Sequence, residues 1–179
     1  DAELAIKLGA DLLGFILASG PRHVSADTVA SLSDLSVMKI GVVVDDVSEA
    51  LSLLQSGFLD AVQFHGEQKP NACYKLAFPY YTALRVGSSS DFEREYEFHC
   101  PRVLLDAFSP LARGGTGRSI DDRLLDQRSS EHPSLPPLWL AGGVGPSNVA
   151  SIISKYHPEF CIFIDFIRGR ILFRSPCQP

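Results

Sequence analysis

Short, almost wholly apolar runs recur along this chain and alternate with segments of helical character. Seven runs, spaced by roughly 20–25 residues as in successive βα units, occupy residues 12–17, 39–44, 59–64, 80–86, 102–106, 138–141 and 159–167. Short runs that are apolar throughout suit strands buried on both faces, as strands are in parallel sheets. The alternation therefore predicts an α/β protein with a parallel sheet and right-handed crossovers.

The segments between these runs are predicted to be helical. Ser25 is placed to cap one of them, and Pro70 and Pro146 stand in the first turns of two others. The predicted helices cover residues 1–9, 25–35, 48–56, 70–77, 90–98, 120–127 and 146–155, and residues 129–137 form a polar connector. The units share no consensus sequence, which favours a barrel or an open sheet over a solenoid.

The order of the elements distinguishes these two arrangements. Seven strands preceded by a helix can form an open doubly wound sheet. A (β/α)8 TIM barrel needs eight strands, so it requires one more strand before Asp1 and a helix after Ile167. We expect the barrel, incomplete in its first strand and last helix, because it accounts for both ends together. Residues 1–167 are predicted to form a single barrel domain, and residues 168–179 a divergent basic tail.

Charge and hydropathy exclude several classes of protein. The net charge is −5, so a nucleic-acid partner is not expected. The longest apolar runs, residues 12–18 and 160–164, are far shorter than the ~20 residues of a membrane helix. Four cysteines without metal-ligand spacing indicate reduced thiols, and no secretory leader is visible. We therefore expect a cytoplasmic protein that binds neither membranes nor nucleic acid.

Polar residues gather at the ends of the predicted strands. In barrels of this class the functional groups lie at the carboxyl ends of the strands and in the loops that follow. The residues at these positions are Arg22, His65, Arg85, Asp106, the glycine-rich residues 114–117, Gly142 and Gly143. Each has an ordinary explanation when taken alone: a solvated loop charge, a turn residue, a cap or a tight turn. Their shared position is what favours a functional site.

The glycine-rich turns indicate an anion-binding site. Backbone N–H groups of such a turn at a helix N-terminus attract phosphate, and glycine lets the backbone approach closely. Phosphate sites in barrels often use the loops after the last strands, where Gly142 and Gly143 stand. The GxGxxG and Walker patterns are both absent from the sequence.

Four sequence motifs of the chain resemble those of the phosphoribosylanthranilate isomerases, a (β/α)8 barrel family of tryptophan biosynthesis. They are residues 9–15 (GADLLGF) with 20–25 (GPRHVS), residues 60–66 (DAVQFHG), residues 104–106 (LLD) with 114–117 (GGTG), and residues 140–149 (LAGGVGPSNV). They stand in the order and at the spacing of that family, over about residues 1–160. The DAVQxHG and GGTG elements together are the most specific part of the match.

The resemblance implies an Amadori rearrangement of N-(5-phosphoribosyl)anthranilate to 1-(2-carboxyphenylamino)-1-deoxyribulose 5-phosphate, without a metal or organic cofactor. Asp106 matches the family's general acid, which protonates the furanose ring oxygen. Arg22 matches the position that contacts the anthranilate carboxylate, for which a guanidinium is geometrically suited. His65 matches a position that lines the site. The remaining matches, near the substrate and its phosphate, are Gly115, Gly117, Gly142 and Gly143.

The sequence departs from the family in its catalytic base. The family's base is a cysteine in a Lys-x-Cys-Gly motif at the end of its first strand. None of the four cysteines, Cys73, Cys100, Cys161 and Cys177, stands in such a motif. Cys73 and Cys161 are expected to be small buried thiols. We therefore expect this chain to be impaired as an isomerase.

The C-terminal residues depart from the family as well. The family's last strand carries a D-x-S-S-G-x-E motif, of which Asp165 matches only the first position. Residues 1–167 carry 13 basic and 21 acidic groups, whereas residues 168–179 carry three arginines and no acid. The loss of the motif together with the change of charge suggests a changed or decayed reading frame over the tail.

Two other functions stay open from the sequence. One is a non-catalytic barrel remnant that still binds a phosphosugar through Arg22 and the glycine turns. The other is a related phosphate-binding barrel enzyme such as indole-glycerol-phosphate synthase, for which catalytic lysines are expected. Only Lys39 lies near a predicted strand, at its wrong end. The expected partner is a small phosphosugar. The chain is expected to be a monomer or homodimer. Whether it is fused to, or associates with, other tryptophan-pathway enzymes stays open from the sequence.

Overall fold

The computed structural model describes residues 2–69, 76–98, 102–107, 119–165 and 170–174, with side chains up to residue 162. The predicted helix over 70–77 lies almost wholly outside the described residues, and the glycine-rich residues 114–117 lie wholly outside them. The chain divides into two compact units, one of residues up to Tyr81 with Ile164–Arg174, the other beginning at Thr82 and including Phe163. Each unit is described by itself below.

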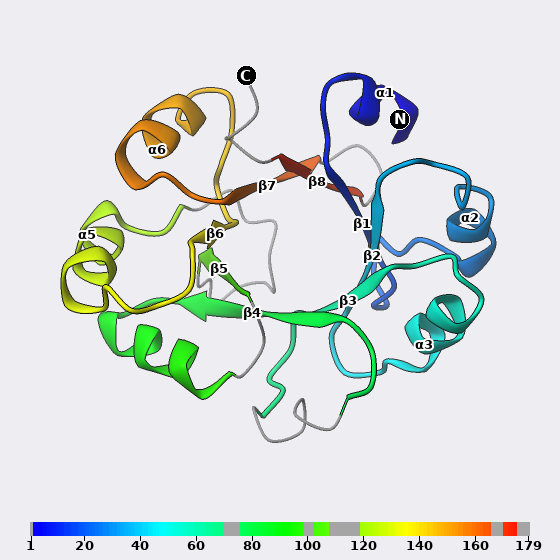
Figure 1. The fold of residues 1–179 in the computed structure, drawn as a ribbon, viewed down its shortest axis with the longest axis horizontal. Helices are drawn as coiled ribbons and strands as arrows, with labels where there is room; N and C mark the ends of the chain where they lie inside the picture. The colour runs from blue at the N-terminus through cyan, green and yellow to red at the C-terminus, as the bar shows by residue number, and fades with distance from the viewer. Residues whose placement is uncertain (1, 70–75, 99–101, 108–118, 166–169, 175–179) are drawn as a thin grey trace. The chain divides into compact units, whose positions relative to one another are not determined.

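The first unit is built on parallel strands in chain order. They are β1 (Leu12–Ile16), β2 (Met38–Val43) and β3 (Ala61–Phe64), and β2 pairs with both of its neighbours. A further strand, β8 (Arg170–Arg174), pairs with β1 in the antiparallel direction. The helices are α1 (Ala2–Lys7), α2 (Ala26–Ala30) and α3 (Ser48–Gln55). In Figure 1, α2 and α3 lie along one face of β2 and β3.

Apolar side chains fill the space between these strands and helices. Phe15, Val29 and Val62 are completely buried in one cluster, and full burial of such a side chain contributes about 1.5–3 kcal/mol. Gly41 in β2 suits this packing, because a Cβ atom there would lie 2.7 Å from Leu59 Cδ1 and the leucine side chain would have to move. The sheet and its helices are thus held in close contact by small residues as well as by large ones.

The second unit continues the pattern of parallel strands in chain order. Its strands are β4 (Tyr80–Val86), which begins in the last residues of the first unit, β5 (Val103–Ala107), β6 (Trp139–Leu140) and β7 (Phe160–Asp165). Its helices are the 3-10 helix η1 (Ser89–Glu97), α5 (Asp122–Glu131) and α6 (Val149–Tyr156). The completely buried side chain of Phe92 anchors η1.

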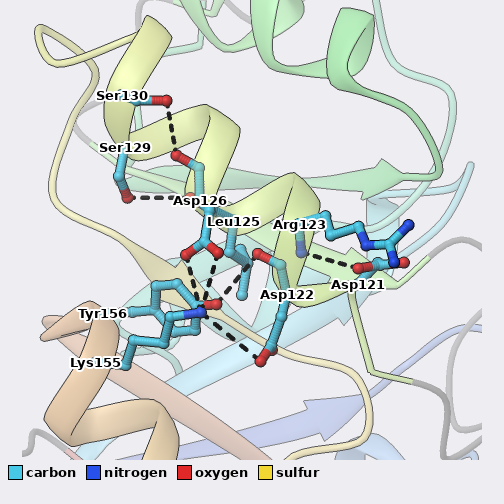
Figure 2. Close-up of polar contacts among 9 residues, drawn as sticks. All are labelled: Asp121, Asp122, Arg123, Leu125, Asp126, Ser129, Ser130, Lys155 and Tyr156. Atoms are coloured by element: carbon cyan, nitrogen blue, oxygen red, sulfur yellow. Dashed lines mark hydrogen bonds and ion pairs between the residues drawn. The ribbon is translucent and has the colours of Figure 1, made fainter.

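Ion pairs hold the helices of the second unit together. Glu95 of η1 and Arg128 of α5 form a buried pair with two hydrogen bonds of 2.8 Å. On the surface, Lys155 of α6 lies 2.9 Å from Asp126 and 3.8 Å from Asp122, both of α5 (Figure 2). The exposed cluster ties α6 to α5 and lies on helices, not at the ends of strands.

The predicted strands are confirmed to within two residues at most of their ends. The helix predicted over 146–155 begins only at Val149, the helix predicted over 90–98 is a 3-10 helix, and three further segments differ as well. The helix predicted over 25–35 ends at Ala30, where the Ser31 hydroxyl donates to the Thr28 carbonyl (2.8 Å). The helix predicted over 120–127 runs on to Glu131 through residues assigned to a connector. The strand β8 was not predicted at all, because its three apolar residues are flanked by arginines.

Candidate active site

Asp106 lies at the carboxyl end of β5, in a strand that is buried at every position. Its side chain is only 1 % exposed, and its Oδ1 accepts a hydrogen bond from the Ala107 N–H (2.9 Å). The β4–β5 register pairs Arg85 with Asp106, and paired residues of neighbouring parallel strands project from the same face of the sheet. The carboxyl group is thus fixed in place, with a cationic residue on the adjacent strand.

The Gly142 backbone packs directly against Asp106. A Cβ atom at Gly142 would lie 2.6 Å from Asp106 Oδ1 and 2.8 Å from the Ala107 nitrogen. Gly142 and Gly143 have φ values of 80° and 62°, in the left-handed region that favours glycine. The two glycines predicted from the sequence therefore form a turn after β6, and at Gly142 a side chain would not fit at this distance from the carboxyl group.

Two residues that the sequence analysis did not select hold this turn. Asn148 Oδ1 accepts from the Gly145 N–H (2.8 Å), and Asn148 Nδ2 donates to the Gly143 carbonyl (2.8 Å). The Ser119 hydroxyl donates to the same carbonyl (3.2 Å). An asparagine directly before a helix that follows a Gly-Gly turn is the signal in the sequence that could have found this role. The turn leads into α6, whose N-terminus can attract an anion.

In the first unit, Arg22 lies in the turn that follows β1. Val24 N–H donates to the Ile16 carbonyl (2.8 Å), which folds this loop back to the end of the strand. Gly20 takes a φ of 148° within the loop. Arg22 is half-buried there, at the carboxyl end of its strand as predicted.

His65 directly follows β3, and its N–H donates to the Val43 carbonyl (2.8 Å) of the neighbouring strand. Its ring Nδ1 lies 2.9 Å from Gln63 Nε2, and Gln63 Oε1 accepts from the Tyr81 hydroxyl (2.8 Å). The next residue is Gly66, where glycine is favoured because a side chain would collide with the Val44 carbonyl oxygen. Gln63 and Tyr81 were not singled out from the sequence, since each stands inside a run that reads only as a buried strand.

The predicted site residues thus fall in two groups. Asp106 and Gly142 are in contact within the second unit, and Arg22 and His65 each follow a strand of the first unit. Gly115 and Gly117 lie outside the described residues. Within the described part of the chain, no group of three or more histidine, cysteine, aspartate or glutamate residues is placed to hold a metal ion. None of its helices is long and apolar enough to cross a membrane.

Of the four cysteines, Cys161 is the one that lies within the described residues. It is buried in β7, and this burial raises the pKa of its thiol to about 11. It is therefore a small buried thiol, as predicted. Cys73, Cys100 and Cys177 lie outside the described residues.

The fold class is α/β, with parallel strands joined by helices and polar residues after the strands, and the solved structures that it resembles are TIM barrels. Residues 1–169 match the family model described as N-(5'phosphoribosyl)anthranilate (PRA) isomerase. The chain belongs to this family of isomerases. The expected α/β class and the expected isomerase family are thereby confirmed.

Known members of the family align with most of the chain. An N-(5'-phosphoribosyl)anthranilate isomerase from Desulforudis audaxviator (strain MP104C) is 36% identical over an alignment of 163 residues, and the match covers 88% of this chain and 78% of the relative. A phosphoribosyl anthranilate isomerase solved in complex with reduced 1-(o-carboxyphenylamino)-1-deoxyribulose 5-phosphate is 27% identical with a TM-score of 0.73. The match covers 98% of this chain and 86% of that one. Monomers generated from the dimeric isomerase of Thermotoga maritima are also similar, at 27% identity and a TM-score of 0.71, over 88% of this chain and 77% of that one.

Proposed function

We propose that the site built around Asp106 serves the Amadori rearrangement of N-(5-phosphoribosyl)anthranilate to 1-(2-carboxyphenylamino)-1-deoxyribulose 5-phosphate. The observation that carries this proposal is the fixed carboxyl group of Asp106 against the Gly142 turn, in a chain of the isomerase family. Asp106 is the general acid: it donates its proton to the furanose ring oxygen, and the ring opens as the C–O bond breaks. The electron pair on nitrogen completes the Schiff base.

The other site residues bind the substrate in this proposal. Arg22 pairs with the anthranilate carboxylate through its planar guanidinium. The turn of Gly142 and Gly143 before α6 accepts the phosphate, together with Gly115 and Gly117. Asn148 supports this role, because it fixes the turn without using the N–H groups of the two glycines. His65 lines the site, and neither a metal nor an organic cofactor takes part.

The rearrangement also needs a base that removes the C2′ proton. No cysteine of the chain stands in the family's Lys-x-Cys-Gly motif. Cys161 is unsuited, because a thiol with a pKa of about 11 is protonated near neutral pH. We propose that residues 1–179 alone turn over substrate about 10²–10⁴-fold more slowly than a chain that carries the base.

Calorimetry and turnover measurements on the purified 179-residue chain test these statements. We expect the chain to bind the reduced carboxyphenylamino-deoxyribulose phosphate and to convert substrate slowly. Asp106→Asn should abolish the residual turnover, whereas the exposed control Asp126→Asn should not change it. Failure to bind the analogue would overturn the proposed function, and turnover at the rate of the family would show that the base is assigned wrongly.

A chain extended by a strand that ends in Lys-x-Cys-Gly separates an enzyme from a remnant. We expect the extension to raise turnover. Tight binding without any turnover in the extended chain would favour the non-catalytic phosphosugar-binding protein instead. The alternative of a lysine-dependent synthase has less support, because the Lys39 ammonium at the start of β2 donates to the Leu35 and Val37 carbonyls (3.2 Å each).

The assembly and location of the chain are part of the same proposal. We propose a cytoplasmic monomer or homodimer that acts on a small phosphosugar. The dimeric isomerase of Thermotoga maritima supports the homodimer. Sedimentation at micromolar concentration distinguishes the two states.

A further inference from the structure

A short chain of buried hydrogen bonds ends on the His65 ring. The Tyr81 hydroxyl donates to Gln63 Oε1 over 2.8 Å, and Gln63 Nε2 lies 2.9 Å from His65 Nδ1. Gln63 is completely buried and Tyr81 is 5 % exposed, so water does not compete for these bonds. Two residues, Tyr81 and Gln63, thereby fix one ring nitrogen of a third, His65, which is a candidate site residue.

The chemistry of the amide decides where the His65 proton lies. The Nε2 group of glutamine carries two hydrogens and donates only. The ring nitrogen that faces it must therefore accept, which places the proton of a neutral imidazole on the other nitrogen. A phenol hydroxyl can donate or accept, and here the Tyr81 hydroxyl donates to Oε1, which favours this orientation of the amide. Burial raises the pKa of Tyr81 well above its ordinary value, so this donor keeps its proton.

We propose that Gln63 and Tyr81 are positioning residues that hold His65 as the Nε2–H tautomer. His65 then carries its donor at Nε2, an atom that is buried in this structure, and this donor is offered to an oxygen atom of the phosphosugar when the ligand binds. In this tautomer Nε2 carries hydrogen, and the Nδ1 lone pair is directed at the Gln63 amide and not at the C2′ proton. The choice of ligand rests on the proposed function, whereas the tautomer does not.

Nitrogen NMR of the ¹⁵N-histidine-labelled chain tests the tautomer directly. The chain has five histidines, and His65→Gln identifies the resonances of His65 by difference. We expect Nε2 to bear the proton and Nδ1 to be unprotonated. A proton on Nδ1 would overturn the proposal, because it would require the Gln63 amide to be turned the other way.

Substitutions at Gln63 test whether this residue sets the tautomer. In Gln63→Glu an ionised carboxylate accepts only, so the proton should move to Nδ1 of His65. If that variant does not fold, Gln63→Met should leave a mixture of tautomers. Tyr81→Phe should also produce a mixture, whereas the exposed control Tyr96→Phe should leave His65 unchanged. Unchanged His65 resonances in both Gln63 variants, or in Tyr81→Phe, would refute the role of that residue.

Calorimetry with the reduced carboxyphenylamino-deoxyribulose phosphate tests the donor role. Loss of one well-placed hydrogen bond should weaken binding about tenfold in Gln63→Glu. The effect should disappear in a His65→Gln background, because Gln63 acts through His65. Equal weakening in both backgrounds would refute this coupling. Failure of the unsubstituted chain to bind the analogue would instead refute the proposed function and leave the tautomer result standing.

Discussion

Replacing Gly142 by alanine perturbs the contact on which the candidate site depends. The new methyl carbon would lie 2.6 Å from Asp106 Oδ1, 2.8 Å from the Ala107 nitrogen and 3.0 Å from Ala107 Cβ. Two of these neighbours belong to backbone or to a buried carboxyl group, so neither can swing away into solvent. Alanine would also have to adopt a φ of 80°. The substitution therefore combines backbone strain with a steric clash against the proposed acid.

Gly57 provides a control that separates these two effects. It has a φ of 74°, and nothing lies within 4 Å of a Cβ atom placed there. Gly57→Ala should cost about 1–2 kcal/mol of unfolding free energy, from the left-handed backbone alone. Gly142→Ala should cost the same amount and about 1–3 kcal/mol more, which is the usual cost of overpacking a buried site.

Urea unfolding of both variants measures the difference, and calorimetry with the reduced carboxyphenylamino-deoxyribulose phosphate measures its effect on the site. We expect Gly142→Ala to bind the analogue at least tenfold more weakly and Gly57→Ala to bind it normally. Equal losses of stability in the two variants would refute the steric argument. Normal binding by Gly142→Ala would show that the turn does not contact the ligand.

Three further predictions concern stability and reactivity. Glu95→Gln leaves Arg128 buried without its ion-pair partner, so urea unfolding should show a loss of about 3–5 kcal/mol. The Arg102 hydrogen bond lowers the pKa of Glu159 below its ordinary value of 4.5. The ion pair therefore stabilises the folded chain fully at pH values above 4.5, and this stabilisation is lost as the pH falls through the lower pKa that Glu159 has in the folded state. The difference in unfolding free energy between the unsubstituted chain and Glu159→Gln should shrink under acid. A difference that does not change with pH would contradict this. Cys161 should react with iodoacetamide slowly in the folded chain and rapidly in urea, as peptide mass spectrometry can measure, because its pKa is raised to about 11.

The strands could be predicted from the sequence because buried parallel strands need apolar residues at every position. The ends of two helices could not, because serine acts in opposite ways at them. The Ser31 hydroxyl donates a hydrogen bond to the Thr28 carbonyl at the end of α2. In α5, Ser129 and Ser130 instead donate to carbonyls four residues earlier while the helix continues (Figure 2). Only the packing around each helix decides between these outcomes.

The candidate site was predictable to the extent that its residues follow strands. Asp106 and Gly142 stand at the ends of two predicted strands, and their contact follows from the β5–β6 pairing. Asn148 and Gln63 were missed for different reasons. Asn148 bonds to residues close to it in the chain, and its place before a helix that follows a Gly-Gly turn is a signal that the sequence carries. Gln63 acts through Tyr81 of the neighbouring strand, and the sequence does not show which side chains the pairing of strands brings within reach. The tautomer is therefore visible only in the three-dimensional structure.

The antiparallel pairing of β8 with β1 has a consequence for how the chain folds during synthesis. The first unit contains residues from both ends of the described chain, with the second unit encoded between them. Ribosomes add about 5–20 residues per second, so β1 waits on the order of ten seconds before its β8 neighbour exists. During that interval the residues of β1 that pair with β8 lack this partner, and strand edges without their partner can pair with other chains. Of the two units, the first unit begins to be synthesised earlier but is completed later. The time that translation needs to reach Arg174 therefore sets how long this unit can pair wrongly with other chains.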